Sequence, residues 1–167
     1  MSNLLVQNIK HTNGTTAQTI DSSGNTKIAG HVAQVIQATF SEQGSIGSGS
    51  ATTLINQTFT PKFSDSKFLV SIHLPNCTST DGEKVVVNAY IGTSSTPASN
   101  TNIINHQEEM GGTGADDTRS INNQDYGSFT ASSTSTHYVS LTVTPDATLT
   151  VARHATTGKL ILQEVAQ

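Results

Sequence analysis

The stretch from Thr60 to Leu74 constrains the fold more than any other part of this chain. It begins as a turn, because Pro61 fixes a backbone dihedral and Ser64–Ser66 is a run of residues that bond their own backbone in turns. Polar and apolar side chains then alternate, with Lys67, Ser71 and His73 on one face and Phe68, Val70, Ile72 and Leu74 on the other. This period of two predicts a β-strand with one buried face. Such a strand needs a second layer to cover it, so the stretch predicts a layered β structure.

The composition favours the same structure. Only 34% of the residues are hydrophobic and 12% are charged, while Ser, Thr, Asn and Gly are abundant. Thr suits strands, and Ser, Asn and Gly suit turns. About eight or nine short strands, separated by turn signals, follow residue 31 without a convincing helix. We therefore expect an all-β fold, a jelly-roll-like antiparallel β-sandwich spanning residues 31–167.

The charge and the cysteine count exclude several classes of protein. The formal net charge is −4 and the eight basic residues are scattered, which argues against binding to a nucleic-acid backbone. The start of the chain has no basic segment and its apolar run is short, so we expect no signal peptide. No stretch has the length of a membrane span. The single cysteine, Cys77, excludes an intrachain disulfide and is expected to be a buried small hydrophobe.

Residues 1–30 differ from the rest of the chain and are expected to form an extended N-terminal arm. The only early apolar cluster is Leu4, Leu5, Val6 and Ile9, and two turn signals follow it, at His11–Thr16 and Asp21–Asn25. Such a segment cannot build its own core. It is either an arm that lies on another molecule, with the apolar cluster as its anchor, or a stalk that forms when several copies associate.

The last predicted strand has three consecutive apolar residues, Leu160, Ile161 and Leu162. One face of a sandwich strand can bury only alternate residues, so the other face needs a cover. A subunit interface is one candidate for that cover. Crowding by neighbouring loops is the alternative.

The sequence offers little for catalysis. Its six histidines do not pair at metal-ligand spacing, and no motif frames a reactive serine or a phosphate-binding loop. We expect no enzyme activity, no metal and no cofactor. The best candidate site is an acidic loop predicted over Gln107–Asp125, with Glu108, Glu109, Asp116, Asp117 and Asp125. It is a solvated loop, a Ca²⁺ site, or a recognition loop; two of its carboxylates could also serve a glycan-cleaving enzyme.

Several landmarks together resemble a known family. They are Thr16–Asn25 followed by Thr26–Ile28, the segment Gly30–Gln37, the segment Thr60–Val70, and the closing segment Lys159–Ala166. In this order they resemble fibre proteins of tailed phages, especially marine phages. The resemblance implies a virion structural protein, commonly a homotrimer, with a β-sandwich head. Because the chain is short, it implies a head fibre, a capsid-decoration protein or a short tail-attached fibre.

The resemblance also implies partners and a location. Residues 1–30 would bind other virion proteins of the capsid or tail, and the protein would be made in the host cytoplasm and reside in the virion. A receptor- or glycan-binding adhesin module is the alternative, because the polar loops at Gly92–Asn102 and Gln107–Asp125 could recognise a host-surface glycan. A polysaccharide depolymerase is a further alternative.

Overall fold

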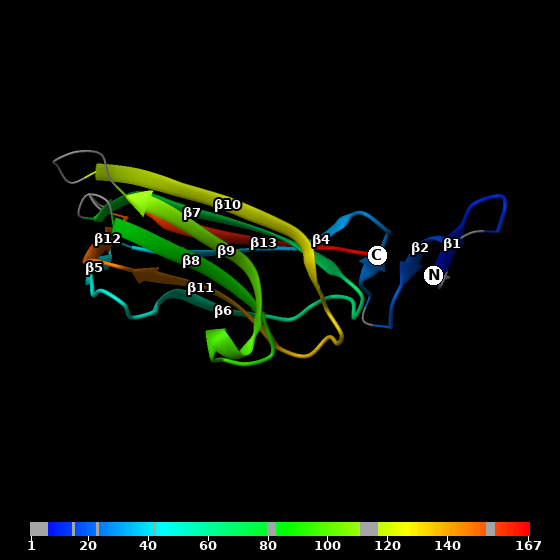
Figure 1. Ribbon diagram of the computed structural model, residues 1–167. Coiled ribbons are helices and arrows are strands. Elements are labelled where there is room, and N and C mark those ends of the chain that lie inside the picture. Colours follow the sequence, from blue (N-terminus) through cyan, green and yellow to red (C-terminus); the bar gives the residue numbers. More distant parts are fainter. Residues whose placement is uncertain are drawn as a thin grey trace.

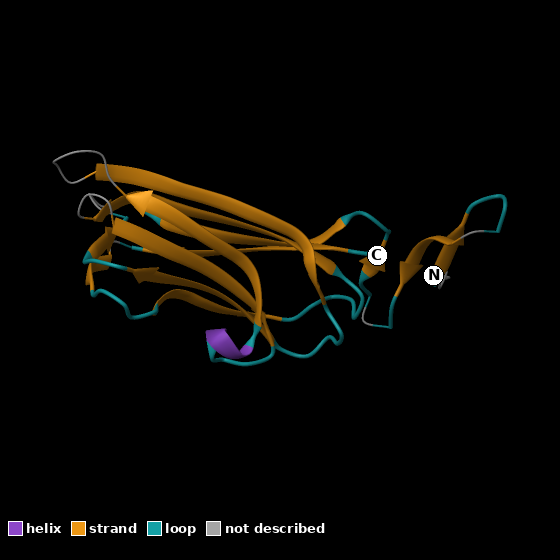
Figure 2. Ribbon diagram, viewed as in Figure 1, coloured by secondary structure: helices purple, strands orange, loops and turns teal. Residues whose placement is uncertain are grey.

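The computed structural model describes residues 7–14, 16–22, 24–41, 43–79, 83–110, 117–152 and 156–167, apart from the side chains of Asp117 and Thr118. Leu4, Leu5, Val6 and Asp116, which were predicted as anchoring or recognition residues, lie outside this part of the chain. In the part described, strands dominate, and the only helical segment is the short 3-10 helix η1 (Pro97–Ser99) (Figure 2).

The head is a sandwich of two antiparallel sheets (Figure 1). The first sheet contains, in spatial order, β4 (Val32–Phe40), β13 (Gly158–Val165), β7 (Lys67–Ser79) and β10 (Asp117–Thr130). Beyond β13, the short strand β12 (Leu149–Val151) continues along the same edge of β7 and pairs with β5 (Gln43–Ile46). The second sheet contains β6 (Thr52–Phe59), β11 (His137–Pro145), β8 (Glu83–Gly92) and β9 (Thr101–Met110).

The strand order identifies the architecture. When the eight long strands are numbered along the chain, the first sheet has the order 1-8-3-6 and the second has the order 2-7-4-5. Consecutive strands therefore alternate between the sheets, except for the fourth and fifth, which pair in the second sheet. This arrangement is the double Greek key of a jelly roll. The predicted fold class is confirmed.

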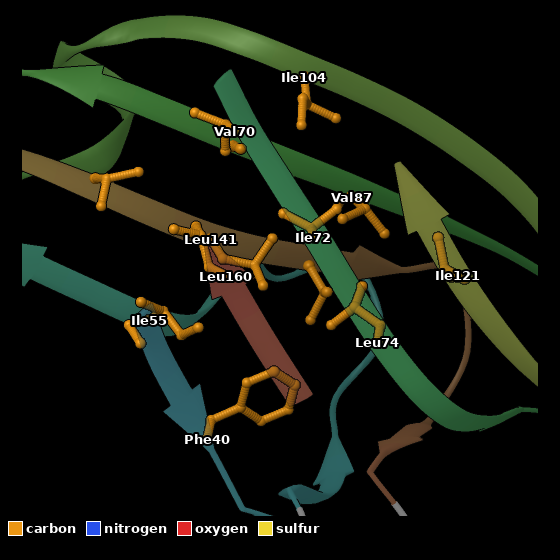
Figure 3. Packing of buried hydrophobic residues seen from close by; sticks show 14 of the residues in the cluster. Phe40, Ile55, Val70, Ile72, Leu74, Val87, Ile104, Ile121, Leu141 and Leu160 are labelled. Atoms are coloured by element: carbon orange, nitrogen blue, oxygen red, sulfur yellow. The ribbon is translucent and has the colours of Figure 1, made fainter. Parts of the chain in front are cut away.

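The core between the sheets contains the residues that the alternation predicted. Phe68, Val70, Ile72 and Leu74 of β7 are at most 3% exposed. They face the inward row of β8, where Val85, Val87, Ala89 and Ile91 are fully buried (Figure 3). The alternating pattern of each strand therefore fixes which side chains form the core.

The structure corrects one predicted loop and extends a predicted strand. The strand predicted over Phe68–Leu74 continues as β7 to Ser79. The acidic loop expected over Gln107–Asp125 is largely a pair of strands, because β9 runs to Met110 and β10 starts at Asp117. Met110 at the end of β9 and Ile121 near the start of β10 are buried, and they anchor these strand ends in the core. Because most other residues of this stretch are polar, the alternation typical of a strand was not evident from the sequence.

The N-terminal segment forms a small sheet of its own at one end of the head (Figure 1). It contains β1 (Asn8–Lys10), β2 (Thr16–Ile20) and β3 (Thr26–Lys27). Both predicted turns are present. The amide of Gly14 donates to His11 O at 2.9 Å, and the Asp21 carboxylate accepts from the backbone and side chain of Asn25 at 2.8 and 2.9 Å.

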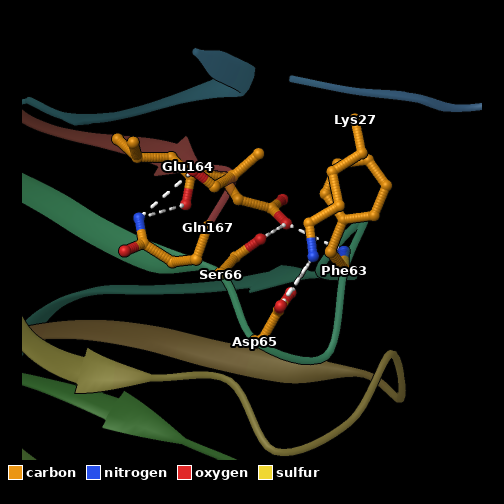
Figure 4. Close-up of polar contacts among 8 residues, drawn as sticks. Lys27, Phe63, Asp65, Ser66, Glu164 and Gln167 are labelled. Atoms are coloured by element: carbon orange, nitrogen blue, oxygen red, sulfur yellow. Dashed lines mark hydrogen bonds and ion pairs between the residues drawn. The ribbon is translucent and has the colours of Figure 1, made fainter. Parts of the chain in front are cut away.

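A buried carboxylate, Glu164, organises the end of the head nearest this sheet (Figure 4). It lies on β13, is fully buried, and accepts hydrogen bonds from the turn before β7. The donors are the amides of Lys62 (2.8 and 3.0 Å) and Phe63 (3.1 Å) and the hydroxyl of Ser66 (2.6 Å). Gln34 of β4 donates through its side-chain amide. Glu164 thus fastens the predicted turn to β13 and β4.

Replacing Glu164 with Ala should destabilise the head strongly. The change leaves the Lys62 and Phe63 amides and the Ser66 hydroxyl without their acceptor in a buried site, and we expect a loss of about 3 kcal/mol in the free energy of unfolding. Urea denaturation followed by circular dichroism measures this loss. Gln163→Ala, at the neighbouring half-exposed position, is the matched control and should change the free energy of unfolding little. Equal effects of the two substitutions would contradict this role of Glu164.

Gly158 at the start of β13 packs directly against an aromatic ring. A Cβ at this position would lie 2.0 Å from two ring atoms of Phe40. We expect Gly158→Ala to displace the Phe40 ring and to reduce the free energy of unfolding by about 1–3 kcal/mol. Gly44→Ala is the matched control, because nothing lies within 4 Å of its added Cβ. Thermal denaturation of the two variants tests the prediction, which fails if they melt together.

Candidate functional site

The three apolar residues predicted as a subunit interface do not share a surface. Leu160 and Leu162 are fully buried in the core between the sheets. Ile161 points to the opposite side of β13 and is half-exposed. Side chains alternate along a strand, so only the middle residue is accessible to a partner. The proposed interface residues are therefore reduced to Ile161.

The predicted acidic residues do not gather at one place either. Glu108 of β9 accepts a hydrogen bond from His106 on its own strand at 3.2 Å and forms an ion pair at 3.2 Å with Arg119 on β10. Glu109 is exposed and pairs in register with Lys84 of β8. Asp125 accepts hydrogen bonds from Ser128 around the positive-φ turn at Gly127, and the backbone of Asp117 pairs with Ser79. These contacts stabilise strands and turns, so the described carboxylates do not form a single recognition loop.

The described residues contain no group of three His, Cys, Asp or Glu side chains that could hold a metal ion. Cys77 is buried, as expected, and this burial raises the pKa of its thiol to about 12 despite a backbone hydrogen bond from Ile121 that lowers it. A thiol with such a pKa is protonated at neutral pH and is a poor nucleophile. The buried His137 donates from Nδ1 to Ser135 O at 2.8 Å and packs against the ring of Phe59, as a core histidine does.

The N-terminal sheet has no core. Among the described residues of the segment 7–30, every one is exposed or half-exposed. Ile9, the described member of the predicted anchor, is 47% exposed on β1. The sheet is attached to the head by a few contacts: Lys27 Nζ lies 2.6 Å from Asp65 and 5.5 Å from the ring centre of Phe63, and the Gly30 amide donates to Ala166 O at 2.8 Å (Figure 4). Apolar surface on this sheet is therefore available to a partner.

The most distinctive surface of the head is the solvent side of the first sheet, which we call the outer face. The strand register places its residues in three cross-strand rows. The rows are Thr39, Lys159, His73 and Asn122; Gln37, Ile161, Ser71 and Gln124; and Val35, Gln163, Leu69 and Tyr126. Lys67 extends the outer face beyond the third row. Val35 and Tyr126 are 59% and 56% exposed, so the face combines amides with accessible apolar groups.

A hollow of about 420 Å³ lies on the outer face. It is lined by Ser71, whose small side chain lies between the larger Ile161 and Gln124 in the same row. His73, Asn122 and Lys159 of the adjacent row form another side, and Nδ1 of His73 donates to Oδ1 of Asn122 at 2.5 Å. Volumes of this size are typical of small-molecule sites. The outer face is therefore the best candidate site in the described part of the head.

The sequence patterns did not indicate this site. The outward positions Ser71 and His73 were evident from the alternation of β7, but their neighbours come from strands far away in the sequence. Only the register of β10 and β13 against β7 brings Gln124 and Lys159 beside them. Along β10, the alternation of exposed Asn122, Gln124 and Tyr126 is the one local signal that could have indicated an outward strand face.

In the part of the chain that is described, no helix is long and apolar enough to cross a membrane. No family model matches the sequence, and no curated protein matches it either. Comparison with solved structures finds similar chains. A structure described as Bacillus endospore appendages that form disulfide-linked pili has 10% identity and a TM-score of 0.39, and the match covers 80% of this chain and 90% of that one.

Capsid structures of infectious bursal disease virus are also similar. The VP2 subviral particle has 13% identity and a TM-score of 0.38, with 81% of this chain covered. The virus of the Gt strain has 13% identity and a TM-score of 0.35, with 97% covered. The chain spans about two fifths of the length of these viral chains, 38% and 43%. These similar structures are thus a pilus protein and viral capsid proteins. The identities and TM-scores are too low to carry an argument about the activity or partners of this chain.

Proposed function

We propose that this chain is a structural protein of a virus particle, a short fibre or head-decoration protein that is held by its N-terminal segment and assembles as a homotrimer. The observation that carries the proposal is the N-terminal sheet, which has no buried residue among those described. A small sheet without an apolar core is not stable by itself in water. Its order must come from another surface, as the anchor of a particle-bound protein requires.

The head suits the same role. Its jelly roll is built on an apolar core that buries Phe68, Leu74, Leu141 and Leu160 almost completely. In this proposal the head is a rigid module, and the attachment lies in β1–β3. The sequence resemblance to phage fibre proteins points to the same division between anchor and head.

The homotrimer is proposed to form through the N-terminal sheet. Three copies of β1–β3 can cover one another, because in a closed symmetric assembly each copy buries the exposed apolar patch of the next copy. Ile9, 47% exposed, is the most exposed of the large apolar residues described in this sheet, and such an association would bury it. Of the three residues predicted as the interface, only Ile161 is accessible, and a single side chain offers too little apolar surface to hold three copies together.

Removal of the N-terminal sheet tests the anchor. A variant that begins at Ala29 keeps the hydrogen bond from Gly30 to Ala166 and loses the Lys27–Asp65 ion pair. The Asp65 side chain is 53% exposed, so the loss should cost at most about 1 kcal/mol. We expect a folded, β-rich monomer by circular dichroism and light scattering, whereas the full chain should have the mass of a trimer. A full chain that is monomeric at micromolar concentration contradicts the homotrimer, and a truncated chain that unfolds contradicts the division into arm and head.

The location of the protein tests the virion role. Antibodies against the head, used on purified particles from a culture that produces the protein, should label the capsid surface or the tail in electron micrographs. Protein found only outside the particle fraction after sedimentation would contradict the proposal. The full chain added to particles stripped of it should rebind, and the variant that begins at Ala29 should not.

An adhesin is the second candidate function, and the hollow on the outer face favours it. This site lies on the sheet and not on the polar loops where the sequence suggested recognition. A depolymerase would need two carboxylates held across a groove, and the residues described along the hollow include no carboxylate.

A further inference from the structure

We infer that the hollow on the outer face, between Ser71, Ile161, Lys159, His73, Asn122 and Gln124, binds an acidic saccharide. This inference goes beyond the proposed virion role and does not depend on it, because the binding can be measured on the isolated protein. It rests on the shape of the hollow, on the groups that surround it, and on the charge of the outer face.

The groups around the hollow match the hydroxyls of a sugar. Gln124 and Asn122 carry amides that both donate and accept, and the hydroxyl of Ser71 does the same. Because Oδ1 of Asn122 can only accept, Nδ1 of His73 carries the proton in their 2.5 Å hydrogen bond. The Nε2 atom of a neutral His73 is then an acceptor, and the Asn122 amide nitrogen can donate to a ligand. Vicinal hydroxyls need this mixture of donors and acceptors.

The hollow also has an apolar side. Ile161 is half-exposed there, on the same cross-strand row as Ser71. Tyr126, 56% exposed, lies one row away on β10, two residues from Gln124, which is roughly 7 Å along a strand. A sugar ring has one face of C–H groups that such side chains can contact.

The charge of the outer face selects an anionic ligand. The chain has twelve acidic and eight basic residues, yet none of the outward register positions on this face is acidic, and two of them are lysines. Lys159 borders the hollow and Lys67 lies at the end of the face nearer the N-terminal sheet. Clefts bordered by one sign of charge attract ligands of the opposite sign. A carboxylate or sulfate on the sugar would pair with Lys159.

A second copy of the chain is the other occupant to consider. If two copies met through this face, the interface would contain lysines of both copies and no acidic residue from the outward rows to pair with them, so it would lack charge complementarity. The same face on an acidic saccharide has complementary charge and complementary hydrogen bonds. The observations therefore favour the saccharide.

Calorimetric titration of the full chain tests the inference. The probes are tetragalacturonate, an alginate tetramer and a sulfated galactan tetramer, and at least one should bind, with an affinity that falls as salt is added. The methyl ester of tetragalacturonate and a glutamate tetrapeptide are the controls. The ester lacks the charge and the peptide lacks the hydroxyls, so both should bind more weakly than the best acidic saccharide.

Three variants locate the site. Lys159→Gln should weaken binding by about tenfold, the usual range for a charge-assisted hydrogen bond. Lys84→Gln, an exposed lysine on the second sheet, is the matched control and should leave the affinity unchanged. Ser71→Leu keeps every charge but fills the hollow, and it should abolish binding while the circular dichroism spectrum stays that of the native head.

The outcomes that overturn the inference are distinct. Failure of all three acidic saccharides to bind overturns it, and so does equal binding of the methyl ester or of the peptide. Equal losses of affinity in Lys159→Gln and Lys84→Gln would show that the charge of the whole surface attracts the saccharide and that no specific site binds it. A change of oligomeric mass by light scattering in Ser71→Leu or Lys159→Gln would make the outer face an interface between copies. None of these results bears on the location of the protein in a particle.

Discussion

The buried carboxylate of Glu164 is the interaction on which the rest of the structure depends. A buried carboxylate is costly unless hydrogen bonds replace its water, and here the donors are the backbone and neutral side chains. Those donors come from β4 and from the turn before β7, which are distant in sequence. Any register of β13 other than the observed one would leave the carboxylate and two backbone amides buried without partners. The hydrophobic pattern disfavours a shift by one residue, and Glu164 also disfavours a shift by two residues, which would keep the apolar side chains inward.

That alignment determines the outer face. With β13 fixed between β4 and β7, Ile161 lies beside Ser71 and Lys159 beside His73. The pairing of β10 with the other edge of β7 then adds Gln124 and Asn122 to the same rows. The hollow is lined by the row in which the small Ser71 lies between Ile161 and Gln124. The carboxylate at one end of the sheet thus controls the geometry of a surface several residues away along β7.

The parts of the fold that local patterns encode could be predicted from the sequence. The alternation at Phe68–Leu74 gave the strand, its buried face and the need for a second layer, and the turn signals gave the hairpins of the N-terminal sheet. The strand β10 could not be predicted in full. Its inward positions Asn123, Asp125 and Gly127 are polar or small, so it is a strand because β7 supplies its backbone partners and not because of its own pattern.

The candidate site could not be predicted for a related reason. Its rows join residues from β4, β13, β7 and β10, and no window of the sequence contains two neighbours across a row. The residues that were selected from the sequence for their acidic or apolar side chains did not identify the site. The carboxylates of β9 and β10 attract attention as a cluster in sequence, yet Glu108 is engaged with Arg119 and His106, and Asp125 with Ser128. Three consecutive apolar residues likewise suggested one patch, whereas alternation puts Leu160 and Leu162 in the core.

The positions of the N-terminal sheet and the hollow suggest how one small chain could combine attachment with recognition. The sheet leaves the head at the end where Gly30 bonds to Ala166 (Figure 1). The hollow lies on the outer face of the head, several residues along β7 from that end. Attachment through β1–β3 therefore need not cover the outer face.

A shallow, solvent-open site for a charged sugar is expected to be weak, because water and salt compete for Lys159. Three heads held by one stalk would present three such sites at a fixed spacing, and the second and third contacts would then be intramolecular. A weak site is sufficient under that condition, since the effective concentration set by the stalk supplies the avidity that the single hollow lacks.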